Sequence, residues 1–143
     1  MRISTRGRYA MKLMAELGRQ FQKNANQILD LKKIAKNQKL PLKYIEHIIS
    51  VLRRAGLVNS VRGVTGGYKL NRSPDKISSL DILESAENIS DFCPCFKQTA
   101  ACQFENVCGL CDFWKGLRAM LIKYLQGISL TDIVSMSKAE SRR

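Results

Sequence analysis

The chain has 143 residues, of which 45% are hydrophobic and 25% are charged, and its net charge is +12. This composition fits one small folded domain, or a domain with an appendage, and excludes a disordered chain. No apolar run approaches the ~18 residues that span a membrane, and a single histidine, His47, excludes catalysis by paired histidines.

The positive charge is confined to the first half of the chain. Residues 1–76 contain 17 Lys and Arg against 4 Asp and Glu, whereas residues 77–143 contain 7 against 8. A basic half joined to a balanced half indicates one region that meets a polyanion, most often nucleic acid, and another with a separate task. No apolar segment follows the first basic residues, so we expect a cytoplasmic protein without a membrane partner.

The first 56 residues carry three helical patterns. Apolar residues recur at helical spacing over 9–21, and Asp30 is a suitable N-cap for a second, short helix. That helix buries Leu31, Ile34 and Ala35. Pro41 suits the first position of a third helix, which Gly56 ends, and the apolar side of this helix consists of Leu42, Ile45, Ile49 and Leu52.

Two short β-like runs follow, at residues 57–62 and 68–72, around the glycine-rich segment 63–67. The order helix, helix, turn, helix, hairpin is that of a winged helix-turn-helix. We therefore predict a mainly α fold with a small β hairpin, in which residues 1–76 form a DNA-binding domain.

The second half is predicted to hold three more helices. Ser78 and Asp81 form a capping-box start for the first of them. A wide apolar stripe from about Cys108 to Gly127 predicts a long helix, which we expect to pair with its copy in a homodimer. A last short helix, capped by Ser129 or Thr131, should bury Leu130, Ile133, Val134 and Met136. Residues 77–143 are thus interpreted as a cysteine-containing segment, about 88–111, with dimerisation helices.

The third helix presents a polar face that suits the major groove of DNA. A glutamate can accept a hydrogen bond from cytosine, and an arginine beside a flexible glycine tip can enter the minor groove. Each of these side chains, taken alone, could equally belong to a solvated helix face or a flexible turn. The predicted contacts with double-stranded, palindromic operator DNA come from Lys43, Tyr44, Glu46, His47, Arg53, Arg62, Gly66 and Gly67.

All five cysteines lie between residues 93 and 111. An odd number in a cytoplasmic chain argues against a disulfide framework, and the clustering indicates one site. The spacing Cys-x6-Cys-x5-Cys-x2-Cys suits an iron–sulfur cluster better than zinc, because structural zinc usually takes two Cys-x-x-Cys pairs. Reactive thiols or a redox disulfide remain the alternative. The predicted ligands are Cys95, Cys102, Cys108 and Cys111, with Cys93 as a possible substitute for Cys95.

The sequence resembles the bacterial Rrf2 family of winged-helix transcription regulators, most closely its iron–sulfur members of the IscR and NsrR type. The long helix contributes Trp114 to the resemblance, which covers nearly the whole chain. The other matching segments are Met1-Arg2, Gly7-Arg8-Tyr9-Ala10, Tyr44-Ile45-Glu46, Leu52-Arg53, Gly56-Leu57-Val58, Ser60-Val61-Arg62-Gly63, Gly66-Gly67-Tyr68 and the cysteine segment.

The resemblance implies a homodimer that binds operator DNA and senses a cluster through three cysteines and one histidine. The three cysteines align with Cys95, Cys102 and Cys108, and the histidine position holds Cys111. The family's DNA contacts carry over to Tyr44, Glu46 and Arg62, and the glutamate is linked there to the choice between operator types.

We therefore predict a transcription regulator and not an enzyme, which senses cluster, redox or nitric oxide status. It is interpreted as a repressor, but the sequence does not distinguish repression from activation. A 2Fe–2S cluster is favoured over 4Fe–4S. The alternatives are a metal-free thiol regulator on the same scaffold and a small redox or cluster-transfer protein.

Overall fold

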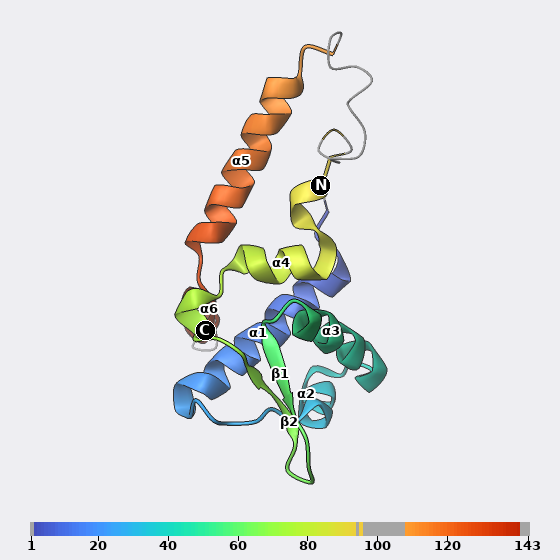
Figure 1. The fold of residues 1–143 in the computed structure, drawn as a ribbon, viewed down its shortest axis with the longest axis vertical. Coiled ribbons are helices and arrows are strands. Elements are labelled where there is room, and N and C mark those ends of the chain that lie inside the picture. Colours follow the sequence, from blue (N-terminus) through green and yellow to red (C-terminus); the bar gives the residue numbers. More distant parts are fainter. Residues whose placement is uncertain (1, 94, 96–107, 141–143) are drawn as a thin grey trace.

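The computed structural model describes residues 2–93, 95 and 108–140 (Figure 1). Its elements in chain order are α1 (Thr5–Lys23), α2 (Leu31–Gln38), α3 (Leu42–Arg54), β1 (Val58–Val61), β2 (Gly67–Leu70), the 3-10 turn η1 (Pro74–Lys76), α4 (Ser79–Glu87), the 3-10 turn η2 (Ile89–Asp91), α5 (Cys111–Gly127) and α6 (Leu130–Glu140). The predicted class, mainly α with a small hairpin, is confirmed.

Local capping sets the bounds of the first three helices. Ser4 accepts a hydrogen bond from the Gly7 amide, so α1 begins at Thr5 rather than near Tyr9, where the apolar periodicity starts. Asp30 caps α2 as predicted, by accepting from the Lys32 amide. Pro41 is the N-cap of α3 and not its first helical residue, a shift of one position.

The main core lies between α1, α3 and α4. Leu13, Ile45, Leu52 and Ile82 are each at most 1% exposed, and together they join helices from both halves of the chain. The sequence pattern had omitted Ile48, which is also buried. Burial of apolar surface on this scale supplies most of the stability of a small domain.

The hairpin extends from this core as an antiparallel pair in which Val58 lies opposite Leu70 and Val61 opposite Gly67. A bridge between Leu29 and Tyr68 adds the segment before α2 to the outer edge of β2. The two backbone hydrogen bonds of that bridge measure 2.7 and 3.1 Å. The hairpin is therefore attached to the start of the helix-turn-helix as well as to the end of α3.

The C-terminal half packs against α1 through α4 and α6. The predicted capping box of Ser78 and Asp81 starts α4, and a second box of the same kind at Ser129 and Asp132 precedes α6, which selects Ser129 over Thr131. On α6, Leu130 and Val134 are fully buried, and Val134 packs where a β-carbon on Gly18 would lie only 2.7 Å away. The domain boundary at residue 76 remains a prediction.

One burial prediction is wrong. Met136 was expected to be buried, but it is 55% exposed. It lies on the outer side of α6, whereas Leu130 and Val134 face α1 and Ile133 packs partly against the same core.

The long helix stands apart from the rest (Figure 1). It begins at Cys111, three residues later than expected, and it extends away from the body of the molecule. Within α5 only Leu125 is buried, together with Leu83 and Ile89 in a small second core. No helix in the described part of the chain combines the length and the apolar character needed to cross a membrane.

Candidate nucleic-acid interface and thiol site

The third helix presents a polar face because its apolar residues are used by the core. Ile45, Ile49 and Leu52 are buried, while Lys43, Glu46 and His47 are exposed on the other side of α3. Arg53 is also exposed, in the last turn. These predicted contact residues are therefore accessible to a ligand, whereas Tyr44 is half-buried.

Tyr44 has a structural role in addition to the predicted one. Its half-buried ring meets the edge of Tyr9 on α1 with ring centres 5.9 Å apart and planes at 85°. The Lys12 ammonium lies 5.4 Å from the centre of the Tyr9 ring. This contact fixes the start of α3 against α1 and places a basic side chain nearby.

The hairpin tip combines one exposed cation with a tightly packed glycine turn. Arg62 is exposed, and the Val64 side chain at the tip is fully exposed. A β-carbon on Gly66 would collide with the Val61 carbonyl oxygen, and one on Gly67 with the Leu29 carbonyl oxygen. Both glycines are thus required by packing within the protein, so their presence needs no DNA contact to explain it.

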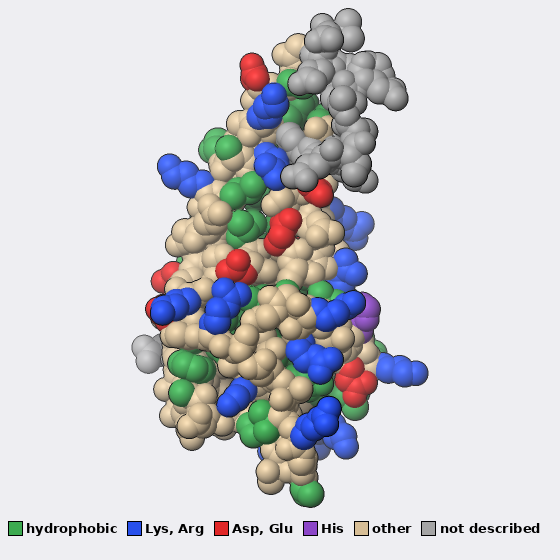
Figure 2. Space-filling view, in the orientation of Figure 1, with side chains coloured by type: hydrophobic (Ala, Val, Ile, Leu, Met, Phe, Trp, Pro, Cys, Tyr) green, Lys and Arg blue, Asp and Glu red, His purple; other side chains and the backbone are tan. Residues whose placement is uncertain are grey.

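Positive charge surrounds these elements. Figure 2 shows Lys and Arg side chains gathered over the half of the molecule that contains α2, α3 and the hairpin. Exposed cations on a convex surface attract a polyanion over a distance of about one Debye length, ~10 Å at 0.1 M salt. The exposed polar side chains of α3 and the exposed Arg62 of the hairpin lie within this basic half of the molecule.

The described cysteines lie at two ends of one segment. Cys93 and Cys95 follow η2, whereas Cys108 and Cys111 stand just before and at the start of α5. Cys95 and Cys108 are exposed, and Cys93 and Cys111 are half-buried. Cys102, the remaining predicted ligand, lies outside the described residues.

The donor chemistry suits a cluster, but the described part does not assemble a site. Thiolates are the ligands that iron–sulfur clusters and zinc share, and the N-terminus of α5 favours negative charge. Among the residues that the structure describes, no three His, Cys, Asp or Glu side chains lie close enough to hold a metal ion.

Both ends of the cysteine segment are connected to the second core. On one side, Glu84 of α4 accepts hydrogen bonds from the amide and the hydroxyl of Ser90, at 3.0 and 2.8 Å. From the other side, the guanidinium Nε of Arg118 on α5 donates to the Ser90 carbonyl at 3.0 Å. Ser90, at the start of the cysteine segment, therefore connects α4 to α5.

One further connection has no signature in the local sequence. Glu87 at the end of α4 accepts from the Ser4 amide at 2.8 Å, so that a carboxylate faces the N-terminus of α1. A β-carbon on Gly7 would collide with this carboxylate. The contact links residues 83 positions apart, and no local pattern predicts such a pair.

Comparison with known proteins decides the family. The Rrf2 model, described as an iron-dependent transcriptional regulator, matches residues 3–136. The chain belongs to the Rrf2 family. The regulator IscR of Cereibacter sphaeroides is 36% identical to this Rrf2 chain over 140 residues, covering 94% of the chain and 87% of that regulator.

Two solved structures confirm the fold. CymR of B. subtilis, described as the global cysteine regulator, superimposes on this Rrf2 chain with a TM-score of 0.76 at 34% identity, covering 95% of this chain and 98% of CymR. T. potens IscR gives a TM-score of 0.74 at 31% identity, with coverages of 96% and 88%. The relatives are transcription regulators and not enzymes, so DNA binding and transcription regulation are confirmed and a small redox or cluster-transfer protein is not supported.

Proposed function

We propose that this Rrf2 regulator binds palindromic operator DNA as a homodimer and senses cluster or redox status through Cys95, Cys102, Cys108 and Cys111. The observation that carries the proposal is the position of the described cysteines, between η2 and α5, the helix whose large apolar side chains are exposed in the described part of the chain. The most favoured sensor is a 2Fe–2S cluster, which when bound supplies a centre sensitive to oxidation and to nitric oxide.

The exposed face of α5 supports the homodimer. Its large exposed apolar residues are spaced alternately three and four positions apart, as in a coiled-coil seam. Their exposed fractions range from 40% to 72%. The residues of this seam are Leu110, Phe113, Leu117, Met120 and Tyr124. A two-fold axis along the seam would place two copies of α3 on the two halves of a palindrome.

The DNA contacts are proposed for the exposed polar face of α3 and the hairpin tip. Glu46 is an acidic group on a basic surface, and such a group is tolerated when it accepts a hydrogen bond from a base. Arg62 is placed to reach the minor groove. Lys43, His47 and Arg53 complete the basic face, while Gly66 and Gly67 let the hairpin backbone approach.

Coupling between thiols and DNA is proposed to run through α4. The cysteine segment is connected to Ser90, which Glu84 and Arg118 hold between α4 and α5. Helix α4 in turn packs on α1 and contacts its N-terminus through Glu87. A reorganised segment would therefore change the angle of α5 and with it the spacing of the two winged units.

A metal-free thiol regulator is the second candidate. The described cysteines do not come together in a metal site, and one similar structure is that of a cysteine regulator. Cys108 has a free, exposed thiol, the state in which a cysteine reacts with oxidants.

Anaerobic purification separates the two candidates. A brown protein with visible absorption, iron and acid-labile sulfide supports the cluster, whereas a colourless protein with reactive thiols and no metal supports the thiol regulator. Cys111→Ser should abolish the cluster. Cys93→Ser and Cys95→Ser are a matched pair, because loss of the cluster in only one of them identifies the first ligand.

The sensing mechanism is tested by operator affinity. We expect cluster-loaded and cluster-free protein, or reduced and oxidised thiols, to differ in affinity for a duplex selected from a random library. Equal affinities of the two forms would contradict coupling through α4, even if the duplex is bound tightly.

A further inference from the structure

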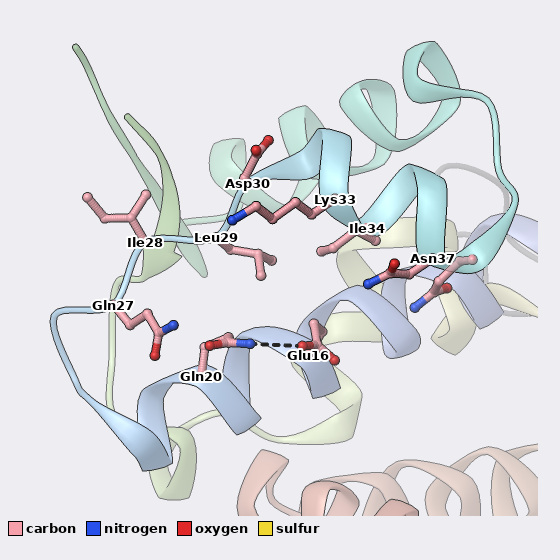
Figure 3. Close-up of a pocket in the computed structure, with 10 residues that line it drawn as sticks. Glu16, Gln20, Gln27, Ile28, Leu29, Asp30, Lys33, Ile34 and Asn37 are labelled. Atoms are coloured by element: carbon pink, nitrogen blue, oxygen red, sulfur yellow. Dashed lines mark hydrogen bonds between the residues drawn. The ribbon is translucent and has the colours of Figure 1, made fainter. Parts of the chain in front are cut away.

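A cavity lies between the second half of α1 and the start of the helix-turn-helix (Figure 3). Its volume is about 240 Å³. Glu16 and Gln20 of α1 form one wall, and the segment before α2 together with α2 itself forms the other. No predicted DNA contact and no cysteine lines this cavity, so it is a separate site.

One wall of the cavity contains an unpaired polar atom. The Gln20 side-chain nitrogen donates to Glu16 at 3.0 Å, but the Gln20 Oε1 atom is shielded from solvent and has no hydrogen-bond donor. Figure 3 shows this oxygen turned away from Glu16, towards the side of the cavity lined by Gln27. An acceptor buried without a partner is costly, so it marks the place for a donor.

The opposite wall contains a positive charge, which suits a carboxylate group. Lys33 of α2 lines the cavity, and Figure 3 shows its side chain extending towards Asp30 and Leu29. The remaining surface is mixed, because the amide side chains of Asn37 and Gln38 alternate there with the apolar side chain of Ile34.

We propose that this cavity binds a free α-amino acid, whose ammonium group reaches Gln20 Oε1 and whose carboxylate reaches Lys33. The volume equals that of about eight waters at ~30 Å³ each, a size that suits a small ligand better than a nucleotide. Ile28, Leu29 and Ile34 provide an apolar surface for an aliphatic side chain. A carboxylate without an ammonium would leave Gln20 Oε1 without a donor, and an amine without a carboxylate would lack the contact with the exposed Lys33 side chain.

The site is placed to influence DNA binding. Leu29 in its wall forms the bridge to Tyr68 of the hairpin, and Asp30 caps α2. A ligand that orders residues 27–30 would therefore restrain the hairpin relative to the helix-turn-helix, which together contact DNA. This regulatory role rests on DNA binding by the family and is independent of the proposed cysteine sensor.

Calorimetric titration of the whole protein with L-leucine, without DNA, tests the site. We expect saturable binding of L-leucine, and binding at least about tenfold weaker for 3-methylbutylamine and 4-methylpentanoate, which lack one charged group each. L-glutamine tests a polar side chain of similar length. Absence of binding by every amino acid, or equal binding of the amine alone, would overturn the proposal and leave a water-filled cavity only.

Two matched pairs of variants place the binding in this cavity. Lys33→Met and Lys32→Met remove the same charge from α2, but only Lys33 lines the cavity. Gln20→Met and Gln22→Met form the corresponding pair on α1. We expect about tenfold weaker binding in the first member of each pair and unchanged binding in the second. Circular dichroism verifies that all four are folded, and equal affinities within both pairs would contradict the site.

The regulatory role is measured separately by fluorescence anisotropy with a selected duplex. L-leucine at a concentration equal to its dissociation constant for the wild-type protein should change the DNA affinity of Lys32→Met clearly more than that of Lys33→Met, although both have lost one positive charge. Unchanged DNA affinity in wild-type protein that binds leucine would overturn the regulatory role. Failure to bind the duplex at all would instead contradict the DNA-binding surface.

Discussion

The winged half and the long helix use apolar residues in opposite ways. In the winged half the apolar face of every helix is covered, and Leu13, Ile45 and Leu52 are almost inaccessible to solvent. In α5 most of the large apolar residues stay exposed, and Met120 reaches 72%. The first pattern stabilises a fold within one chain, whereas the second leaves apolar surface exposed among the described residues, which is typical of an interaction site.

The two regions also differ in charge. The basic excess lies over the winged half, and the half that contains α5 is nearly balanced. Repulsion between like charges would oppose an interface built on the winged half more strongly than one built on α5, whose one acidic and three basic side chains give it a small positive charge. The difference in charge and exposure supports the proposal that the winged half binds the polyanion and that α5 forms the dimer contact.

The largest expected effect tests burial in the winged half. Leu52→Ala removes a side chain with 0% exposure and should lower the free energy of unfolding by about 2–5 kcal/mol. Urea denaturation monitored by circular dichroism gives this value. Val64→Ala at the exposed hairpin tip is the control and should change it by less than about 0.5 kcal/mol. Equal losses in both variants would mean that the hairpin tip is buried in solution.

The next effect concerns the seam of α5. Met120→Lys should weaken self-association about a hundredfold, or about 2.8 kcal/mol, because it introduces a charge into an apolar interface. The control is Ala119→Lys, at an exposed position next to the seam on the same helix. Sedimentation equilibrium measures both. A wild-type protein that is monomeric at micromolar concentration would refute the dimer itself.

A smaller effect is expected for DNA binding. Arg62→Ala should weaken binding to duplex DNA about tenfold and reduce the slope of log affinity against log salt by about 1, since one phosphate contact is lost. Lys123→Ala removes an exposed charge from α5 and should leave both quantities unchanged. A wild-type affinity that does not fall as salt rises would contradict the interface.

The smallest effect concerns a contact between α1 of the winged half and α6 of the C-terminal half. Arg19 pairs with Glu16 at 2.8 Å and donates to Ser137 of α6 at 2.9 Å. Burial raises the pKa of Glu16, but hydrogen bonds from Gln20 and Arg19 and the charges of Arg19 and Lys23 together lower it below its ordinary 4.5.

A lowered pKa in the folded state stabilises the protein above pH 4.5, and this contribution is lost as the pH falls through the folded value. Glu16→Gln should therefore lower the urea midpoint at pH 7 and converge with wild type in acid. The loss should stay below about 1 kcal/mol, because solvent screens this half-exposed pair. A difference that persists at pH 3 would mean that packing and not charge is responsible.

Much of the fold follows from local sequence signals. Asp30, Ser78 and Ser129 cap their helices through contacts within three residues, and the hairpin follows from two β-like runs around glycines. Periodicity located the polar face of α3, because the residues between its core positions can only face outward. The predicted polar contact side chains on that face are indeed exposed.

Other properties depend on contacts between distant segments. Met136 has the spacing of a buried residue, but only the orientation of α6 on α1 shows which side is covered. The contact between Glu87 and the start of α1, the packing role of Gly67 and the cavity beside Gln20 join residues far apart in sequence. The sequence alone determined which segments form helices and where the charge lies, because both depend on neighbouring residues. Only the tertiary structure decided which apolar faces are covered and which polar atoms lack partners, because both depend on how the helices pack.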